Sequence, residues 1–283
     1  MCSRDFENGT FSLPQKPDRS TNVQLTTSAP IAQNTCCAYV AVNLGYALIE
    51  NENRNKRKKE AMANNILKQG DCLDLLAELK DKSIDLLITD PPYCIGTTSN
   101  GTKAAWSDNN LIKPFFEAYF SEIKRVLKDG AEFYINTDWR TYPFLYPIIA
   151  TKLNVKNCVV WDYEWIKAGS HYRFSHEFII YGFKGENKRA FSASERDVWR
   201  EKPINFTGDK YHQAQKPVNL VKKMILNSSN EGDMVLDTFA GSGTTAIACY
   251  ETKRLFTGFE IDDDTFKVAV KRIQNETSQT YLF

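Results

Sequence analysis

The stretch that decides the fold is Ile84–Tyr93, which reads IDLLITDPPY. Its first six residues form a mostly apolar run of the length expected for a buried parallel strand. The run ends on Asp90 and two prolines, which fix φ and hold the chain in a rigid, extended turn. An acidic side chain directly after a parallel strand lies at the sheet edge where open α/β sheets bind ligands. The segment therefore predicts a parallel sheet with a ligand-facing turn.

The rest of the chain from Asn65 onward alternates short apolar runs with helix-patterned stretches, which is typical of an α/β domain. We expect seven strands, at Ile66–Gln69, Ile84–Thr89, Ala131–Asn136, Cys158–Trp165, Phe178–Phe183, Met234–Thr238 and Leu255–Glu260. We expect helices at Cys72–Leu79, Lys113–Leu127, Pro217–Asn227, Thr244–Glu251 and Asp263–Gln274. No helix pattern separates the strands around Trp161 and Ile180, so these two should pair antiparallel at one edge. The predicted fold class is α/β, with a mixed, mostly parallel, seven-stranded sheet and helices on both faces.

A glycine loop follows the strand at Met234–Thr238. Gly241–Ala246 fits the pattern G-x-G-x-x-A, in which small residues permit a tight turn and close approach of the backbone to a ligand. Glu260 ends the next strand, where an acidic side chain can bind two ribose hydroxyls. No Gly-Lys-Ser/Thr follows, so the loop is not a P-loop. The loop alone is compatible with a nicotinamide site, with a site for another adenosine cofactor and with a purely structural turn.

The tetrapeptide Asp90-Pro91-Pro92-Tyr93 has the groups needed to methylate an exocyclic amine. Such an amine is a poor nucleophile until two acceptors hold its N–H bonds, and the Asp90 carboxylate and the Pro91 carbonyl can supply that pair. An amine inside a duplex must be flipped out, and Tyr93 offers an aromatic face on which the base can stack. The alternative is a structural turn capped by Asp90, since Asp-Pro turns are common.

Together these motifs resemble the β class of S-adenosylmethionine-dependent DNA amino-methyltransferases, over roughly Asn65 to Gln274. Asp90–Tyr93 resembles the catalytic motif of that family, and Asp237–Thr245 resembles its cofactor motif. The catalytic motif precedes the cofactor motif, as in the β class. The resemblance implies a Rossmann-like fold and S-adenosyl-L-methionine as cofactor.

The resemblance also implies site residues. Gly70-Asp71 matches the position whose acidic side chain meets the cofactor adenine, and Gln215-Lys216-Pro217 resembles a motif expected near the methionine moiety. The implied catalytic residues are Asp90, Pro91, Pro92 and Tyr93. The implied cofactor-binding residues are Asp71, Cys72, Lys216, Pro217, Asp237, Phe239, Ala240, Gly241, Ser242, Gly243, Thr244, Thr245, Glu260 and Ile261. Trp161, Lys167 and Glu177 fit a looser family pattern and receive no role.

The substrate implied by the resemblance is adenine in double-stranded DNA. Asp-Pro-Pro-Tyr is usual for N6-adenine enzymes, whereas N4-cytosine enzymes more often carry Ser in place of Asp. The family places target recognition between the edge strands and the Gln215 motif, which here is 184–211. Lys188, Arg189, Arg196, Arg200 and Lys202 are the candidates for contacting phosphates or guanine, although some of them can be ordinary surface charges. The loop 96–108 either closes over the flipped base or is a plain surface loop.

Composition places limits on the class of protein. The 283 residues are 42% hydrophobic and 25% charged, and the net charge of +1 means that a nucleic-acid surface must arise from local segregation of charge. The seven cysteines form no C-x-x-C pair, and the three histidines lack metal-ligand spacing, so we expect no metal and a reducing compartment. The most apolar stretch, Ile31 to Ile49, is interrupted by polar residues, so we expect a cytoplasmic protein without a membrane span.

Domain organisation and partners are less constrained by the sequence. Residues 3–35 are rich in Ser, Thr, Asn, Gln and Pro without a sustained hydrophobic period, and Asn51–Glu60 is almost wholly polar. This composition predicts a poorly ordered extension at 1–61 before a methyltransferase domain at 62–283. The sequence does not decide whether the protein forms a homodimer or whether a companion restriction endonuclease exists. Two competing functions are a non-catalytic DNA-binding module that keeps the fold and an oxidoreductase that uses the glycine loop. The oxidoreductase hypothesis leaves Asp90–Tyr93 unexplained.

Overall fold

The computed structural model describes residues 65–93, 109–166, 171–186, 195–204 and 215–277, all within the unit Asn53–Phe283. The predicted extension at 1–61 and the loop 96–108 lie outside these residues.

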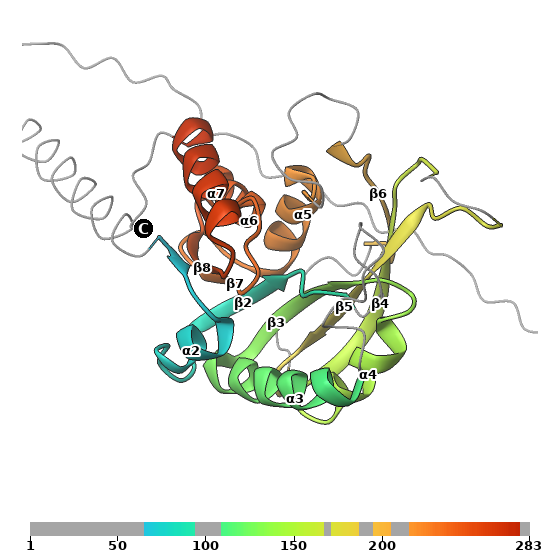
Figure 1. Ribbon diagram of the computed structural model, residues 1–283, viewed down its shortest axis with the longest axis horizontal. Coiled ribbons are helices and arrows are strands. Elements are labelled where there is room, and N and C mark those ends of the chain that lie inside the picture. The colour runs from blue at the N-terminus through green and yellow to red at the C-terminus, as the bar shows by residue number, and fades with distance from the viewer. Residues whose placement is uncertain (1–64, 94–108, 167–170, 187–194, 205–214, 278–283) are drawn as a thin grey trace, which may run out of the picture. The chain divides into compact units, whose positions relative to one another are not determined.

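A single eight-stranded sheet forms the centre of the described part (Figure 1). The strand order is β1-β8-β7-β2-β3-β5-β4-β6. Every neighbouring pair is parallel except the two that involve β5, which runs antiparallel to both β3 and β4. The strands are β1 (Ile66–Gln69), β2 (Ile84–Thr89), β3 (Leu127–Thr137), β4 (Asn154–Asp162), β5 (His176–Phe183), β6 (Val198–Arg200), β7 (Met234–Asp237) and β8 (Leu255–Glu260).

Helices cover both faces of this sheet, as Figure 1 shows. One face packs against α2 (Cys72–Ala77), α3 (Asn109–Val126) and α4 (Tyr142–Ala150), and the other packs against α5 (Val218–Ser228), α6 (Thr244–Thr252) and α7 (Asp263–Glu276). All six residues of β2 are buried, and alternate side chains point to opposite faces. Leu86 and Ile88 join the core under α5–α7, whereas Leu87 joins the core under α3 and α4. This burial on both faces explains the nearly continuous apolar run.

The observed elements confirm the predicted fold class and correct two details. The sheet has eight strands instead of seven, because β6 pairs in parallel with β4 inside the segment expected to form the target-recognition insertion. With three residues, two of them exposed, β6 has no recognisable hydrophobic pattern. The helix α4 was not expected from the sequence, because it contains Pro147 in its interior; a second proline lies in its first turn, where proline is tolerated.

Strand order determines which turns lie side by side. The central strand β2 lies between β7 and β3, and Thr89 at its end is paired with Ile135. All three strands run in the same direction, so their carboxyl ends meet at one edge of the sheet. The glycine loop after β7, the Asp90 turn after β2 and Asn136 near the end of β3 are therefore neighbours.

Candidate active site

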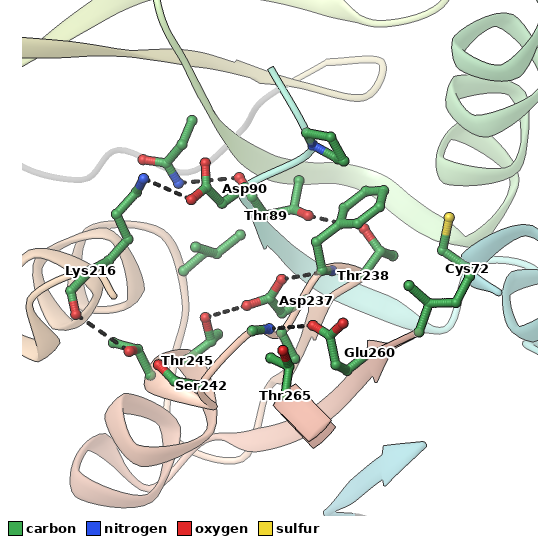
Figure 2. A pocket seen from close by; sticks show the side chains of 18 of the residues that line it. Cys72, Thr89, Asp90, Lys216, Asp237, Thr238, Ser242, Thr245, Glu260 and Thr265 are labelled. Carbon is green, nitrogen blue, oxygen red and sulfur yellow. Dashed lines mark hydrogen bonds and ion pairs between the residues drawn. The ribbon is translucent and has the colours of Figure 1, made fainter. Parts of the chain in front are cut away.

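A cavity of about 440 Å³ opens at this edge of the sheet. Residues from both predicted motifs line it, including Asp90 and Pro92 from the turn after β2, and Gly241 and Ser242 from the loop after β7. Figure 2 shows Asp90 facing Lys216 on one side, Cys72 on the opposite side and Asp237 between them. The sequence motifs thus lie around one shared space.

The glycine loop has a backbone conformation that requires glycine at two positions. Gly241 and Gly243 have φ values of 51° and 79°, in the left-handed region that side chains with a Cβ atom avoid. Arg272 of α7 is almost fully buried and forms hydrogen bonds to the loop. Its Nη1 donates to the Ser242 carbonyl at 3.2 Å and to Thr244 Oγ1 at 2.9 Å. A buried guanidinium with several acceptors fixes the position of α7 relative to the loop.

Glu260 braces the same loop from the end of β8. Its Oε2 accepts a hydrogen bond from the Gly241 N–H at 2.9 Å, and its Oε1 accepts one from the Asp262 N–H at 3.0 Å. Each carboxylate oxygen keeps a further lone pair for a ligand. Asp71, after β1, similarly caps α2 by accepting from the Leu73 N–H at 2.8 Å.

Asp90 belongs to a compact network of charged and hydroxyl groups. Lys216 Nζ lies 2.7 Å from Asp90 Oδ2 and 2.9 Å from Glu177 Oε2. The Tyr93 hydroxyl donates to Asp90 Oδ1 at 2.7 Å and lies 3.3 Å from Glu177 Oε2. Tyr163 donates to the second oxygen of Glu177 at 2.5 Å. One ammonium therefore bridges two carboxylates, and a tyrosine hydroxyl donates to the other oxygen of each carboxylate.

The network stabilises the charged form of its lysine. Burial alone would lower the pKa of Lys216, but the carboxylates of Asp90 and Glu177 outweigh burial and raise it. Burial, and then the same two carboxylates, raise the pKa of Tyr93 well above its ordinary value. Lys216 is therefore a cation and Tyr93 a neutral donor throughout the neutral pH range.

The comparisons with known proteins identify the family of the chain. The family model described as DNA methylase (N6_N4_Mtase) matches residues 84–271. The DNA adenine methyltransferase YhdJ of Escherichia coli (strain K12) is 32% identical over 238 residues, covering 72% of this chain and 81% of YhdJ. The type II methyltransferase M.HpaI of Haemophilus parainfluenzae is 30% identical over 229 residues, covering 72% of this chain and 73% of M.HpaI.

The chain belongs to the DNA methylase family. The crystal structure of TTHA0409 from Thermus thermophilus, complexed with S-adenosyl-L-methionine, has the same fold: its TM-score is 0.60 at 21% identity, with 77% of this chain and 96% of that chain covered. The family, the enzyme class and the Rossmann-like fold expected from the sequence are confirmed.

Most of the predicted site residues of the methylase lie on the cavity wall. Among the predicted cofactor-binding and catalytic residues, those lining the cavity are Asp71, Cys72, Asp90, Pro92, Lys216, Asp237, Phe239, Ala240, Gly241, Ser242, Thr244, Thr245, Glu260 and Ile261. Pro91, Tyr93, Pro217 and Gly243 are not among the residues that line this cavity, and Pro217 lines a second one. Tyr93 reaches the site through its hydroxyl contact with Asp90, and Gly243 caps α6.

The predicted DNA-binding residues fall partly within the described part of the methylase. Arg196, Arg200 and Lys202 are exposed on and around β6, and Arg200 Nε lies 3.6 Å from Asp162 Oδ2. Lys202 and Trp165 line a second cavity of about 630 Å³ beside the start of α5. Lys188 and Arg189 lie outside the described residues.

Several residues that the fold brings to the site were not expected there from the sequence. Asn136 and Phe115 line the cavity, and Glu177 bridges Lys216 and Tyr93 although the sequence assigned it no role. Glu177 is 84 residues from Tyr93 in the chain, so only the pairing of β5 with β3 brings the two together.

Among the described residues, no group of three or more His, Cys, Asp or Glu side chains is arranged to hold a metal ion. The helices found there include none with both the length and the apolar character needed to cross a membrane.

Asp237 makes the stability of the methylase depend on pH. Burial raises the pKa of its carboxyl to about 7, although hydrogen bonds from Thr245 and the Phe239 N–H oppose the shift. The folded-state pKa thus exceeds the usual 3.8, so the stabilisation by the protonated form is complete below pH 4 and is lost as the pH rises to about 7. We expect the free energy of unfolding of Asp237→Asn, relative to that of wild type, to increase by about 2–4 kcal/mol as the pH rises from 4 to 8.

Urea unfolding of both proteins at four pH values between 4 and 8 measures this difference. The matched control is Asp74→Asn, an exposed aspartate in the first turn of α2, which should leave the pH slope unchanged. If Asp237→Asn and wild type lose stability in parallel over this range, the buried carboxyl is not the group that titrates.

Proposed function

We propose that this DNA methylase transfers a methyl group from S-adenosyl-L-methionine to the N6 amine of adenine in double-stranded DNA. The observation that best supports the proposal is the single cavity onto which the Asp90 turn and the glycine loop both open. The name of YhdJ as a DNA adenine methyltransferase supports the choice of base, and the Asp-Pro-Pro-Tyr motif agrees with it. Methylation of cytosine at N4 is the alternative.

The charges on the cavity wall suit the proposed cofactor. Three carboxylates, from Asp71, Asp90 and Glu260, line the cavity together with the Asp237 carboxyl, against the single ammonium of Lys216. S-adenosyl-L-methionine carries a sulfonium and an ammonium group, so such a wall attracts its cationic end. We assign Glu260 to the ribose hydroxyls, Asp71 to the adenine, and the glycine loop to close backbone contact with the methionine part.

The chemistry at the Asp90 turn follows from its acceptors. Bound S-adenosyl-L-methionine would supply an electrophilic methyl group. Asp90 Oδ and the Pro91 carbonyl would accept the two N–H bonds of the target amine and direct its lone pair at that methyl group. Lys216 and Tyr93 hold the Asp90 carboxylate in one orientation, at 2.7 Å each, so little reorganisation is needed when the amine arrives.

The target base would reach Asp90 only after leaving the duplex. We assign the Tyr93 ring to stack on it, next to a Lys216 ammonium that lies 5.6 Å from the ring centroid. We assign the segment 184–211 to target recognition, with Arg196, Arg200 and Lys202 as its exposed basic residues. Lys188 and Arg189 belong to the same proposal.

Substitutions in the glycine loop test the cofactor assignment. A Cβ at position 243 would lie 2.9 Å from Ile273 Cδ1 in a backbone with φ +79°, so we expect Gly243→Ala to lower the free energy of unfolding by about 2 kcal/mol. A Cβ at position 241 meets nothing within 4 Å, and Gly241 lines the cavity. Gly241→Ala should therefore cost only about 1 kcal/mol of stability, from its left-handed φ.

The main effect of Gly241→Ala should be to weaken cofactor binding. We expect Gly241→Ala to weaken the binding of S-adenosylhomocysteine at least tenfold, measured by titration calorimetry. Gly185→Ala is a control at another left-handed glycine with open space, far along the chain from the loop. Unchanged affinity in Gly241→Ala would place the cofactor elsewhere.

One assay tests the function as a whole. Purified full-length protein is incubated with S-adenosyl-L-methionine and unmethylated DNA, and the DNA is digested to nucleosides. We expect N6-methyladenine. N4-methylcytosine would support the alternative base, and the absence of methylation at any salt concentration would favour a non-catalytic DNA-binding module.

The remaining assignments concern the whole protein. We propose a methyltransferase domain at 62–283 preceded by an extension at 1–61, and a cytoplasmic location. Deletion of the extension followed by the same assay tests its role. Homodimer formation and a companion restriction endonuclease remain predictions; light scattering checks the first, and cleavage of unmethylated DNA by a co-purifying protein checks the second.

A further inference from the structure

Asn136 carries an unused hydrogen-bond acceptor on the wall of the cavity. The side chain is 3% exposed and lies on the cavity wall. Its Nδ2 donates to the Thr89 carbonyl at 3.1 Å. Its Oδ1 is the only side-chain nitrogen or oxygen among the buried described residues that lacks a hydrogen-bond partner. Native proteins rarely leave such an atom unpaired, so it points to a missing ligand.

The orientation of this amide follows from its neighbour. If the amide were flipped, Oδ1 would face the Thr89 carbonyl, two acceptors would oppose each other, and the one hydrogen bond would be lost. The oxygen therefore remains the free atom. What it requires is a donor, and an amino group supplies one.

The position of Asn136 narrows the choice of donor. It follows Ile135, the partner of Thr89, so it lies level with Asp90 on the neighbouring strand. The glycine loop follows β7, on the opposite side of β2. Asn136 is thus beside Asp90 on the β3 side of β2, and both side chains line the cavity onto which the glycine loop opens.

We infer that Asn136 Oδ1 accepts a hydrogen bond from an amino group bound beside Asp90. The inference rests on the proposed function and adds a residue to its site. Two amino groups have this chemistry: the exocyclic amine of the target base and the ammonium group of the cofactor. In either case Asn136 has a double role, since Nδ2 also holds the main chain that carries Asp90.

The test compares Asn136→Ala and the nearly isosteric Asn136→Leu with Asn154→Ala. Asn154 is a matched control because its amide also donates to a main-chain carbonyl, that of Gly185, at an exposed site. Binding is measured by calorimetry with S-adenosylhomocysteine, which has the ammonium group, and with 5′-methylthioadenosine, which lacks it. Turnover is measured on plasmid DNA, and thermal melting reports on folding.

If the cofactor is the donor, the Asn136 variants should bind S-adenosylhomocysteine about tenfold more weakly and 5′-methylthioadenosine normally. If the base is the donor, both compounds should bind normally, and kcat should fall by about 10- to 100-fold. The inference is wrong if folded variants match Asn154→Ala in all three measurements, or if both compounds lose affinity equally. Failure of wild type to methylate DNA would overturn the proposed function. The two binding measurements would then still show whether the cofactor ammonium is the donor, and normal binding of both compounds would overturn the inference.

Discussion

Replacing Asp90 with alanine should reduce methyl transfer by at least about 10³-fold and leave cofactor affinity nearly unchanged. Its carboxylate is the proposed acceptor for the target amine, so its loss removes an interaction that matters most in the transition state. The surroundings should persist, because Lys216 keeps Glu177 as a partner at 2.9 Å and Tyr93 remains within 3.3 Å of the same carboxylate.

Two measurements on Asp90→Ala separate these effects. Single-turnover methylation of plasmid DNA gives the rate, and calorimetry with S-adenosylhomocysteine gives the affinity, which should stay within about threefold of wild type. Glu260→Ala is the matched control, since Glu260 also lines the cavity but braces the glycine loop through the Gly241 N–H. It should weaken cofactor binding at least about tenfold. Equal loss of affinity in both variants would contradict the division of labour between the two carboxylates.

The parts of the site that sequence predicts well are those encoded in continuous segments. Ile84–Thr89 is buried on both faces, so its pattern is unambiguous, and the turn at Asp90 follows directly. The glycine loop has the same advantage because the left-handed φ angles of Gly241 and Gly243 require these residues locally. In both cases a physical constraint acts over a few neighbouring positions.

Contacts between distant segments were not predictable. Asn136 reaches Thr89 across 47 residues, and nothing in the sequence around Asn136 distinguishes it from a polar strand end. Glu177 acquires its role from the antiparallel strand β5, which brings it to Lys216. Likewise α4 forms despite Pro147, because Leu145, Ile148 and Ile149 pack into the core. Tertiary packing outweighs local propensity there.

Lys216→Met should be the most destabilising single change at the site. It would leave the carboxylates of Asp90 and Glu177 close together without their shared cation, and the side chains of Lys216 and Glu177 are only 13% exposed. Breaking a buried ion pair by removing one partner typically costs about 3–5 kcal/mol. We expect a loss of this size in the free energy of unfolding, whereas Lys216→Arg should recover part of it because the charge is kept.

The pH dependence identifies the cause of that loss. The folded-state pKa of Lys216 is raised above its ordinary 10.5, so its contribution is fully present below that value and declines only as the pH rises further. The difference between wild type and Lys216→Met should therefore be constant from pH 6 to 9 and shrink toward pH 11, as measured by urea unfolding. Lys222→Met, on the helix α5 that follows Lys216, is the control, since its pair with Glu251 is partly exposed and should contribute about 0–1 kcal/mol. Similar losses in Lys216→Met and Lys222→Met would mean that the ammonium is not what holds the two carboxylates together.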